Sequence, residues 1–233
     1  MLDLDRVNAY LSRVEESETN TFPPVSGKLK VGVDLGTAYI VLVVLDEENN
    51  PVACEKRASG VLRDGVVVDY TGALRIVREL KEKLEARLGA ELVNCAIAMP
   101  AGTESSARTH QYVAEGAGLE VTAVLDEPTG GTHLSLVLAG NYHIPVEEAE
   151  AIKQDYARHR EILPVVRPVV EKMAAIVRRC VDKAGTDAIY LCGGTCCLTG
   201  IEGVFEKETG IRTFKPANPF LVTPTGIAMN CKI

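Results

Sequence analysis

Two β-rich segments, LKVGVDLG and YIVLVVLD, are separated only by Thr37 and Ala38. So short a connection leaves no room for a crossover, and the segments must fold back on each other as an antiparallel hairpin. Every later element has to be added to this hairpin. A third strand is predicted over residues 52–58, followed by VLRDGVVVDY with a tight turn at Asp64-Gly65.

The rest of the first half alternates helices with strands. Helical spacing covers residues 72–88, which end at Gly89, and residues 104–116. Buried strands are predicted at ELVNCAIAMP and LEVTAVL. This order predicts a mixed sheet whose first three strands are antiparallel and whose later strands are parallel.

The second half has no such strand-rich beginning. Residues 132–183 are almost entirely helical in pattern, with interruptions predicted at Pro145, Pro164 and Pro168. The remaining elements are a strand at DAIYLCG, a glycine turn, a helix over about 197–208, a short strand at 211–214 and the segment TPTGIAM. This half therefore has the end of an α/β sheet but not its first three strands.

The N-terminal region is predicted to be a short amphipathic helix followed by a linker that contains Pro and Gly. Such a helix either docks on its own domain or binds a groove of a partner, and we expect the former. Residues 1–27 are thus assigned to helix and linker, 28–128 to a first lobe and 129–233 to an incomplete second lobe.

Composition narrows the class of protein. The net charge of -7 argues against a broad surface for nucleic acid or anionic lipid. No run of about 18 apolar residues is present to span a membrane, and MLDLDRVN begins with acids where a signal peptide needs basic residues. The seven cysteines form an odd set without disulfide spacing. These features favour a cytoplasmic, reduced protein.

Metal sites are not expected from the cysteines or histidines. Cys192, Cys196 and Cys197 cluster without zinc-ligand spacing, so buried packing is the preferred interpretation. The four histidines share no spacing with carboxylates or cysteines and are interpreted as surface or satisfied residues: His110, His133, His143 and His159.

The motif VGVDLGT places Asp34 at the end of a buried strand, where a carboxylate is costly unless it binds a cation or water. Gly36 allows close approach of a ligand, and the turn amides with the Thr37 hydroxyl can meet phosphate oxygens. Magnesium prefers one or two carboxylates together with waters and phosphates, so Asp34 is predicted to bind it through water. The alternative is an ordinary hairpin with an exposed aspartate.

A second glycine turn lies in LCGGTCCLTG. Gly193 and Gly194 would let adenine or ribose lie against the backbone, and a following helix N-terminus would favour anions. A tight turn without a ligand is the alternative.

Together these segments resemble the actin-like and DnaK-type chaperone ATPases. VGVDLGT is similar to their first phosphate loop, DEPT at 126–129 to the first connecting motif, LCGGT to the adenosine loop and TPTGIAM to the second connecting segment. Within that clan, VTAVLDEPT, DEPTGGTHLSLVLAGNY and PVVRPVVEKM resemble the EutJ family of ethanolamine utilisation. The resemblance runs from Lys28 to the C-terminus and implies an actin-like ATPase (ribonuclease H-like) α/β fold of two lobes, each with a mixed sheet and helices.

The same resemblance implies a site for ATP and Mg. Its nucleotide-binding residues would be Asp34, Gly36, Thr37, Gly130, Gly131, Gly193, Gly194 and Thr195. For hydrolysis, Asp34 would organise magnesium, and Glu127 would either help position the attacking water or belong to the later loop.

One departure from the family is large. The family has a second phosphate loop, D-x-G-G-G-T, on a second three-strand meander between two DEPT motifs, whereas here one DEPT serves both contexts. Roughly forty residues are missing, which matches the absent strands of the second half. Gly130-Gly131-Thr132 either substitutes for the lost loop or has another place. Either the segment exists physically in the protein, or the chain is a true deletion.

The function implied is an ATP-binding chaperone or assembly factor in ethanolamine utilisation, cytoplasmic or associated with the bacterial microcompartment. Its partners would be nucleotide and a client protein or microcompartment components. Without the second loop, weak binding and negligible hydrolysis are expected. The alternative is a non-catalytic actin-like scaffold that acts through protein contacts.

Overall fold

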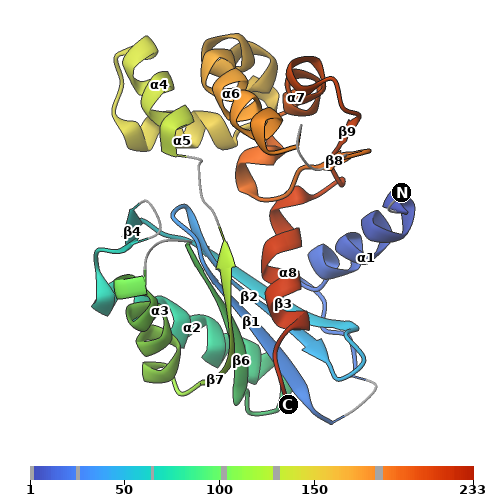
Figure 1. Ribbon diagram of the computed structural model, residues 1–233. Coiled ribbons are helices and arrows are strands. Elements are labelled where there is room, and N and C mark those ends of the chain that lie inside the picture. Colours follow the sequence, from blue (N-terminus) through green and yellow to red (C-terminus); the bar gives the residue numbers. More distant parts are fainter. Residues whose placement is uncertain (1–2, 25–26, 64–65, 101–103, 128–131, 182–185) are drawn as a thin grey trace. The chain divides into compact units, whose positions relative to one another are not determined.

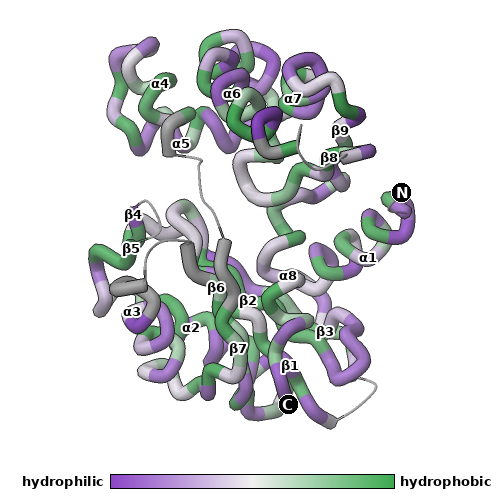
Figure 2. The backbone as a smooth tube through the Cα atoms, viewed as in Figure 1, coloured by the Kyte–Doolittle hydropathy of each residue, from purple (hydrophilic) through white to green (hydrophobic). Residues whose placement is uncertain are grey.

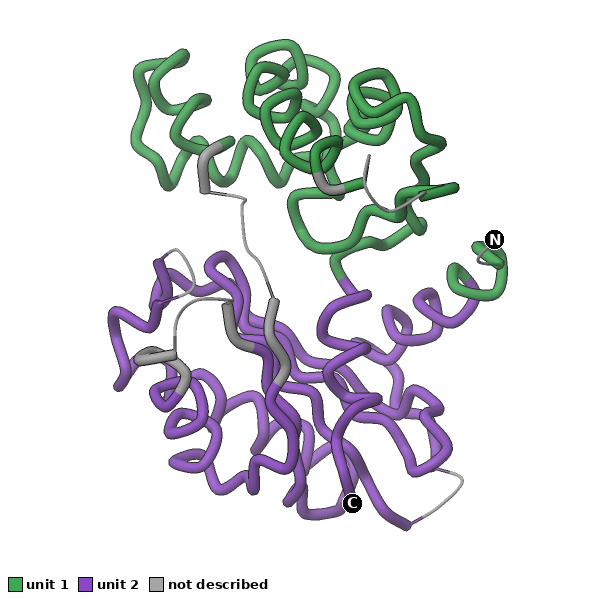
Figure 3. Tube along the Cα trace, viewed as in Figure 1, with its two compact units in different colours: residues 1–8, 130–220 green, residues 9–129, 221–233 purple. Residues whose placement is uncertain are grey.

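The computed structural model describes residues 3–24, 27–63, 66–100, 104–127, 132–181 and 186–233. It divides the chain into two compact units (Figure 3). We call residues 9–129 with 221–233 the hairpin unit, and residues 1–8 with 130–220 the helical unit.

The hairpin unit is built on a five-stranded sheet in the order β3-β2-β1-β6-β7 (Figure 1). β1, β2 and β3 form an antiparallel meander, whereas β1, β6 and β7 are parallel. The predicted mixed sheet is thereby confirmed, including the direction of its strands. The strands are β1 (Leu29–Leu35), β2 (Tyr39–Asp46), β3 (Pro51–Ala58), β6 (Asn94–Pro100) and β7 (Glu120–Glu127), with a separate pair β4 (Leu62–Arg63) and β5 (Val66–Val67). The turn predicted at Asp64-Gly65, between that pair, falls outside the described residues.

Two helices cover one face of this sheet, α2 (Tyr70–Leu88) and α3 (Glu104–Gly116). The Asp69 carboxylate caps α2 by accepting from Gly72 N at 2.9 Å. Gly89 ends α2 in the left-handed conformation, φ 62°, and its N–H donates to the Glu85 carbonyl. Alternate β1 residues (Val31, Val33, Leu35) are buried in the core against these helices.

The C-terminal helix α8 (Val222–Met229) covers the opposite face (Figure 1). A Cβ atom at Gly32 would lie 2.5 Å from both Ala228 N and the Pro224 carbonyl oxygen, so only glycine lets the helix lie this close to β1. Residues 221–233 therefore belong to the hairpin unit. The expectation that all of 129–233 forms one second lobe was wrong in this segment.

We expect Gly32→Ala to lower the free energy of unfolding by about 1–3 kcal/mol, because the added methyl meets backbone atoms that cannot rotate away. Gly203→Ala is the matched control, since a Cβ at Gly203 meets nothing within 4 Å and Ala favours the interior of α7 (Ile201–Thr209). Urea denaturation of both variants measures the difference. Equal stability of the two variants would contradict the close packing of α8.

The N-terminal helix α1 (Leu4–Glu16) leads into a segment that pairs with the edge of β3. Cys54 N donates to the Ser17 carbonyl at 3.0 Å, and Phe22 N donates to the Val52 carbonyl at 2.9 Å. Leu11 and Val14 of α1 are buried. Both lie in the same unit as β3, whereas residues 1–8 are grouped with the helical unit.

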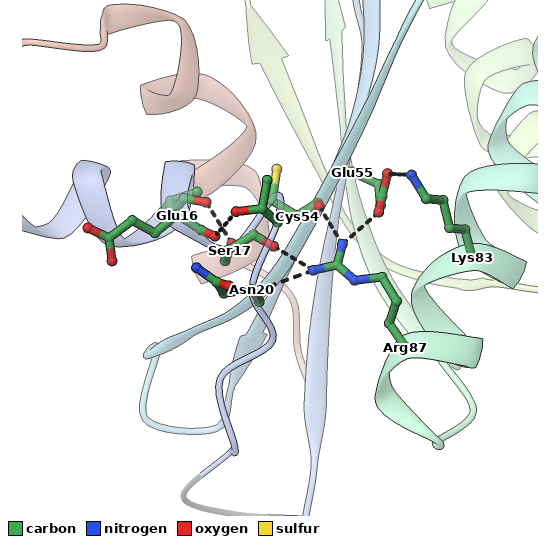
Figure 4. A network of polar contacts seen from close by, with 9 residues as sticks. Glu16, Ser17, Asn20, Cys54, Glu55, Lys83 and Arg87 are labelled. Carbon is green, nitrogen blue, oxygen red and sulfur yellow. Dashed lines mark hydrogen bonds and ion pairs between the residues drawn. The ribbon is translucent and has the colours of Figure 1, made fainter.

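Arg87, in the last turn of α2, holds this segment in place (Figure 4). Its guanidinium donates to the carbonyls of Ser17 at 2.9 Å, Asn20 at 3.2 Å and Cys54 at 3.1 Å. It also pairs at 2.6 Å with the buried Glu55 carboxylate, whose other oxygen accepts from Lys83 at 2.6 Å. One cation thus satisfies acceptors from three separate parts of the chain.

Arg87→Ala should lower the free energy of unfolding by about 2–3 kcal/mol, because it leaves three carbonyls and one buried carboxylate oxygen without this donor. Lys83→Ala removes the other partner of Glu55 and serves as control. The Lys83 side chain is 63% exposed, so its loss should cost less than about 1 kcal/mol. Thermal denaturation with both variants measures the contrast, and a Lys83 effect as large as that of Arg87 would refute it.

The helical unit contains α4 (Thr132–Tyr142), α5 (Val146–Gln154), the 3-10 turn η1 (Tyr156–Arg158), α6 (His159–Val181) and α7, with the short parallel strands β8 (Ile189–Tyr190) and β9 (Thr213–Phe214). Ile162, Val166 and Val170 of α6 are buried in its core. Before β8, the part of this unit that the structure describes forms helices and connections only. The lack of three leading strands, inferred from the sequence, is confirmed for these residues.

Pro164 and Pro168 lie inside α6, so the prediction that they interrupt the helix was wrong. Hydrophilic and hydrophobic residues alternate along α6 (Figure 2). Both prolines are on its exposed side, opposite the buried row at every fourth position from Ile162. The solvent-facing side of a helix best tolerates a missing hydrogen bond, because helices bend with that side outward.

Candidate functional site

The β1–β2 hairpin places Asp34 one residue before the end of β1, where it pairs with Val41. Because Val31, Val33 and Leu35 face α2 and α3, alternation puts Asp34 on the other face with Gly32, the face that α8 covers. Figure 1 shows α8 running antiparallel to β1, so its first turn lies toward the carboxyl end of β1. Asp34 is half-buried there, and a helix N-terminus favours nearby negative charge.

The loop after Asp34 is tight. Leu35 pairs with Ile40, which leaves Gly36, Thr37 and Ala38 to reverse the chain before Tyr39. A Cβ on Gly36 would lie 2.7 Å from the Tyr39 carbonyl oxygen. The turn itself therefore requires glycine at position 36. This requirement holds whether or not a ligand approaches the loop as the sequence suggested.

The parallel strands bring further predicted residues to the same edge of the sheet. β1, β6 and β7 all end there, with Val33 opposite Ile97 and Pro100 opposite Glu127. The backbone of Glu127 thus lies at the same edge of the sheet as Asp34, two strands away. The Glu127 side chain, Gly130 and Gly131 fall outside what the structure describes. In open α/β sheets, ligands bind beyond the carboxyl ends of the strands.

The second predicted turn, Gly193 to Thr195, belongs to the helical unit. Gly193 has φ 95° and ψ 167°, which L side chains rarely adopt, and its N–H donates to the Pro219 carbonyl at 2.8 Å. Gly194 has no such restriction, because a Cβ there would make an ordinary contact of 3.5 Å with the Phe220 ring. Of the two glycines, only Gly193 is required by its backbone conformation.

The helix predicted to begin at about residue 197 begins at Ile201 instead. A 3-10 turn, η2 (Gly194–Cys197), follows Gly193, and Gly200 in the left-handed conformation, φ 86°, precedes α7. The glycine turn therefore opens a short 3-10 turn, and the α-helix N-terminus predicted at this turn was wrong. The residues between the two elements are held by side chains from elsewhere in the unit.

His159 is the main one of these side chains, and no pattern in the sequence predicts this role. Its Nδ1 accepts from Thr199 N at 3.1 Å, and its Nε2 lies 3.0 Å from the Lys153 carbonyl, so the neutral tautomer carries its proton on Nε2. Lys215 Nζ donates to the Leu198 carbonyl at 2.9 Å. His159 is buried and both its ring nitrogens have hydrogen-bond partners, as predicted for a satisfied histidine. Its role in positioning Thr199 is visible only in the fold.

Burial lowers the pKa of His159 below its ordinary 6.5, and the charge of Lys215 lowers it further. The Lys153 carbonyl and Asp155 act in the opposite direction without reversing the shift. The Thr199 N–H can donate to Nδ1 only while the ring is neutral, because a protonated Nδ1 no longer accepts a hydrogen bond.

This shift predicts a loss of stability in mild acid. Above about pH 6.5 His159 is neutral in both the folded and the unfolded chain, so the full contribution is present. As pH falls below 6.5, the unfolded histidine binds a proton that the folded one resists, and the free energy of unfolding drops until pH reaches the lower folded pKa. Urea titrations across this range should show a shallower drop for His159→Gln. The exposed His143, as His143→Asn, should keep the wild-type slope, and an unchanged slope in His159→Gln would contradict this role.

The cysteines divide into two groups. Burial raises the pKa of the Cys54 and Cys95 thiols to about 12, which is typical of unreactive packing residues. Cys192, by contrast, is exposed, and Cys196 and Cys197 are half-buried. Buried packing was therefore the wrong expectation for Cys192, which is exposed two residues after the end of β8, next to the buried Leu191.

Within the described residues, no group of three or more His, Cys, Asp or Glu side chains could hold a metal ion. The magnesium site expected at Asp34 uses a single carboxylate with waters and phosphates, so it is not of that kind. Nor is any described helix long and apolar enough to cross a membrane.

No protein-family model matches the chain. Over 240 residues it is 37% identical to the ethanolamine utilization protein EutJ of Salmonella typhimurium, covering 86% of this chain and 85% of that protein. The crystal structure of EutJ from Carboxydothermus hydrogenoformans matches with a TM-score of 0.88 and 42% identity, covering 98% of this chain and 99% of that one. The chain belongs to the EutJ family.

The alignment with the Salmonella EutJ shows the same gap that the family motifs indicated. It spans 240 residues, whereas 86% of the 233 residues here is about 200, so about 40 positions of that EutJ have no counterpart in this chain. That number agrees with the absence of three leading strands from the residues of the helical unit that the structure describes.

Two more distant structures confirm the actin-like ATPase fold. The PilM-PilN type IV pilus biogenesis complex matches with a TM-score of 0.68 at 14% identity, covering 86% of this chain and 97% of that one. MreB 5 of Spiroplasma citri bound to AMPPNP matches with a TM-score of 0.59 at 14% identity, covering 86% and 95%. At such identities the likeness concerns the fold alone.

Proposed function

We propose that this EutJ-family chain is a nucleotide-binding assembly factor or chaperone in ethanolamine utilisation, which binds Mg-ATP weakly and hydrolyses it negligibly. The observation that carries the proposal is the β1–β2 hairpin, which sets Asp34 and the Gly36–Thr37 turn at the carboxyl edge of the sheet. Asp34 would hold magnesium through water, and the turn amides with Thr37 would hold phosphate oxygens.

The glycine turn supplies the complementary part of the proposal. Gly193, Gly194 and Thr195 would receive the adenosine, on a backbone held by Pro219. A relative of the same fold, the MreB of Spiroplasma citri, was solved with AMPPNP bound, which supports a nucleotide as the ligand.

Weak hydrolysis follows from what the helical unit has lost. Phosphoryl transfer relies on positioning and on stabilising charge around the transferred group. The second phosphate hairpin would do half of that work, and about 40 positions of the Salmonella EutJ are missing here. Glu127 alone would not compensate for it.

The test is thermal denaturation with and without millimolar Mg-ATP. A ligand present at a few times its Kd stabilises the folded state by about 1 kcal/mol, which raises Tm by about 2–4 °C in a chain of this size. Asp34→Ala should abolish the rise. Glu48→Gln, which removes an exposed charge in the turn between β2 and β3, is the matched control and should retain it.

Phosphate release measured on the same samples should stay at background. Turnover that Asp34→Ala abolishes would overturn the prediction on hydrolysis. Intact mass is the necessary check, with 25.1 kDa expected for this sequence. A heavier protein would mean that the second hairpin is present after all.

A second function is favoured by the deletion itself. A chain that has lost one phosphate hairpin can keep the actin-like fold as a non-catalytic scaffold for protein contacts, with a microcompartment component or client protein as the partner. No Tm rise with Mg-ATP, together with binding to such components, would support this function over the first.

A further inference from the structure

The glycine turn of the helical unit is flanked by thiols. Cys192 precedes Gly193, and Cys196 and Cys197 follow Thr195. All three are thiols rather than disulfides, and of the three only Cys192 is exposed. Nothing in the proposed nucleotide function uses them.

Two of these cysteines are brought together by the turn. The Cys196 thiol donates to the Cys192 carbonyl, with sulfur and oxygen 3.1 Å apart, and Cys196 N donates to the Gly193 carbonyl at 3.1 Å. The sulfur of Cys196 therefore lies directly against the backbone that carries the Cys192 side chain. A disulfide needs Cα atoms within about 4.4–6.8 Å, and the 3.1 Å contact of the Cys196 sulfur with the Cys192 carbonyl makes this pair the candidate.

We propose that Cys192 and Cys196 form a reversible disulfide across the Gly193–Thr195 turn and that this oxidation weakens nucleotide binding there. The second half of the proposal rests on the proposed function, whereas the first does not. The oxidant is a peroxide. A disulfide fits these thiols better than a bound metal ion does. Within the described residues, the thiols do not belong to a group of three or more side chains that could hold a metal.

The two thiols have different roles in the reaction. Burial, together with the neighbouring thiols of Cys192 and Cys197, raises the pKa of Cys196 to about 12. Since the thiolate is the nucleophile, the exposed Cys192 meets the oxidant first. Cys196 is then the resolving thiol, and its step is slow at neutral pH and faster in alkali.

The chemistry balances with one peroxide for each disulfide. The Cys192 thiolate attacks one oxygen of hydrogen peroxide, forming the S–O bond of a sulfenic acid while the O–O bond breaks, and the leaving hydroxide takes up the proton lost by the thiol to become water. The Cys196 thiolate then attacks that sulfur, the S–S bond forms, the S–O bond breaks and a second water leaves. Two thiols are oxidised by two electrons, and one peroxide is reduced to two waters.

Oxidation would change the turn that holds the nucleotide. The new bond replaces the contact between the Cys196 thiol and the Cys192 carbonyl and encloses Gly193, Gly194 and Thr195 in a small covalent ring. Gly193 already has a backbone conformation that few residues adopt, φ 95°, so the ring restricts a segment with little freedom to adjust. We expect the affinity for Mg-ATP to fall by about five-fold or more, the lower range of coupling between two sites.

The first experiment maps the bond. The full chain is treated with one equivalent of hydrogen peroxide at pH 7 and pH 9, digested and analysed by mass spectrometry. A Cys192–Cys196 link is expected, formed faster at pH 9 and reversed by dithiothreitol. In Cys196→Ser, dimedone should label Cys192 as a sulfenic acid, whereas Cys197→Ser should keep the link. The proposal is overturned if neither pH gives the link, or if Cys192 links to Cys197 instead.

The second experiment separates the two halves of the proposal. Mg-ATP affinity is measured by thermal denaturation of the reduced and the oxidised wild type, with peroxide-treated Cys196→Ser as a control that cannot close the ring. Weaker binding only in the linked protein supports the regulation, and equal binding before and after linkage overturns it. If the reduced protein does not bind Mg-ATP, the proposed function fails and the regulation with it, while the mapped link stands or falls by the first experiment.

Discussion

The contact between Gly32 and α8 is the constraint on which the hairpin unit depends. At 2.5 Å from a would-be Cβ, the helix backbone lies directly on β1, and the face that carries Asp34 is closed by the last helix of the chain. The opposite face is closed by α2 and α3 through ordinary side-chain packing. The face covered by α2 and α3 thus tolerates small changes of side-chain volume as an ordinary core does. The face covered by α8 requires glycine, whose side chain is a hydrogen atom, at position 32.

The two units repeat the same order of elements to different extents. In the hairpin unit, α2, β6, α3 and β7 follow the three-strand meander. In the helical unit, α6, β8, α7 and β9 appear in the same order, and β8 and β9 are parallel as β6 and β7 are. The described residues of the helical unit contain no counterpart of β1, β2 and β3. Its core is formed instead by α4, α5, α6 and α7 around Ile189 and Leu191.

The sequence predicted what depends on local pattern. Two residues between β-rich runs required the hairpin, and Gly89 marked the end of α2, because such signals act within a few positions. Family motifs located Asp34 and Gly193, and the structure places both at turns. Contacts between distant residues were not predictable: Arg87 reaches Ser17 across 70 positions, and the acceptor of the Thr199 N–H is a histidine 40 positions earlier. The prediction that Pro164 and Pro168 interrupt the helix failed because both lie on the solvent side of α6, and tertiary packing decides which side that is.

The Arg87 contacts and the position of α8 also set the order in which the hairpin unit can be completed during synthesis. Ser17 and Asn20 leave the ribosome early, yet the guanidinium that holds them is made only at residue 87. The sheet face at Gly32 waits longer still, because its cover includes Ala228. Translation proceeds at about 5–20 residues per second, so this apolar face stays uncovered for roughly ten seconds or more after the hairpin has emerged. The residues that are synthesised last therefore complete the part of the fold that is synthesised first.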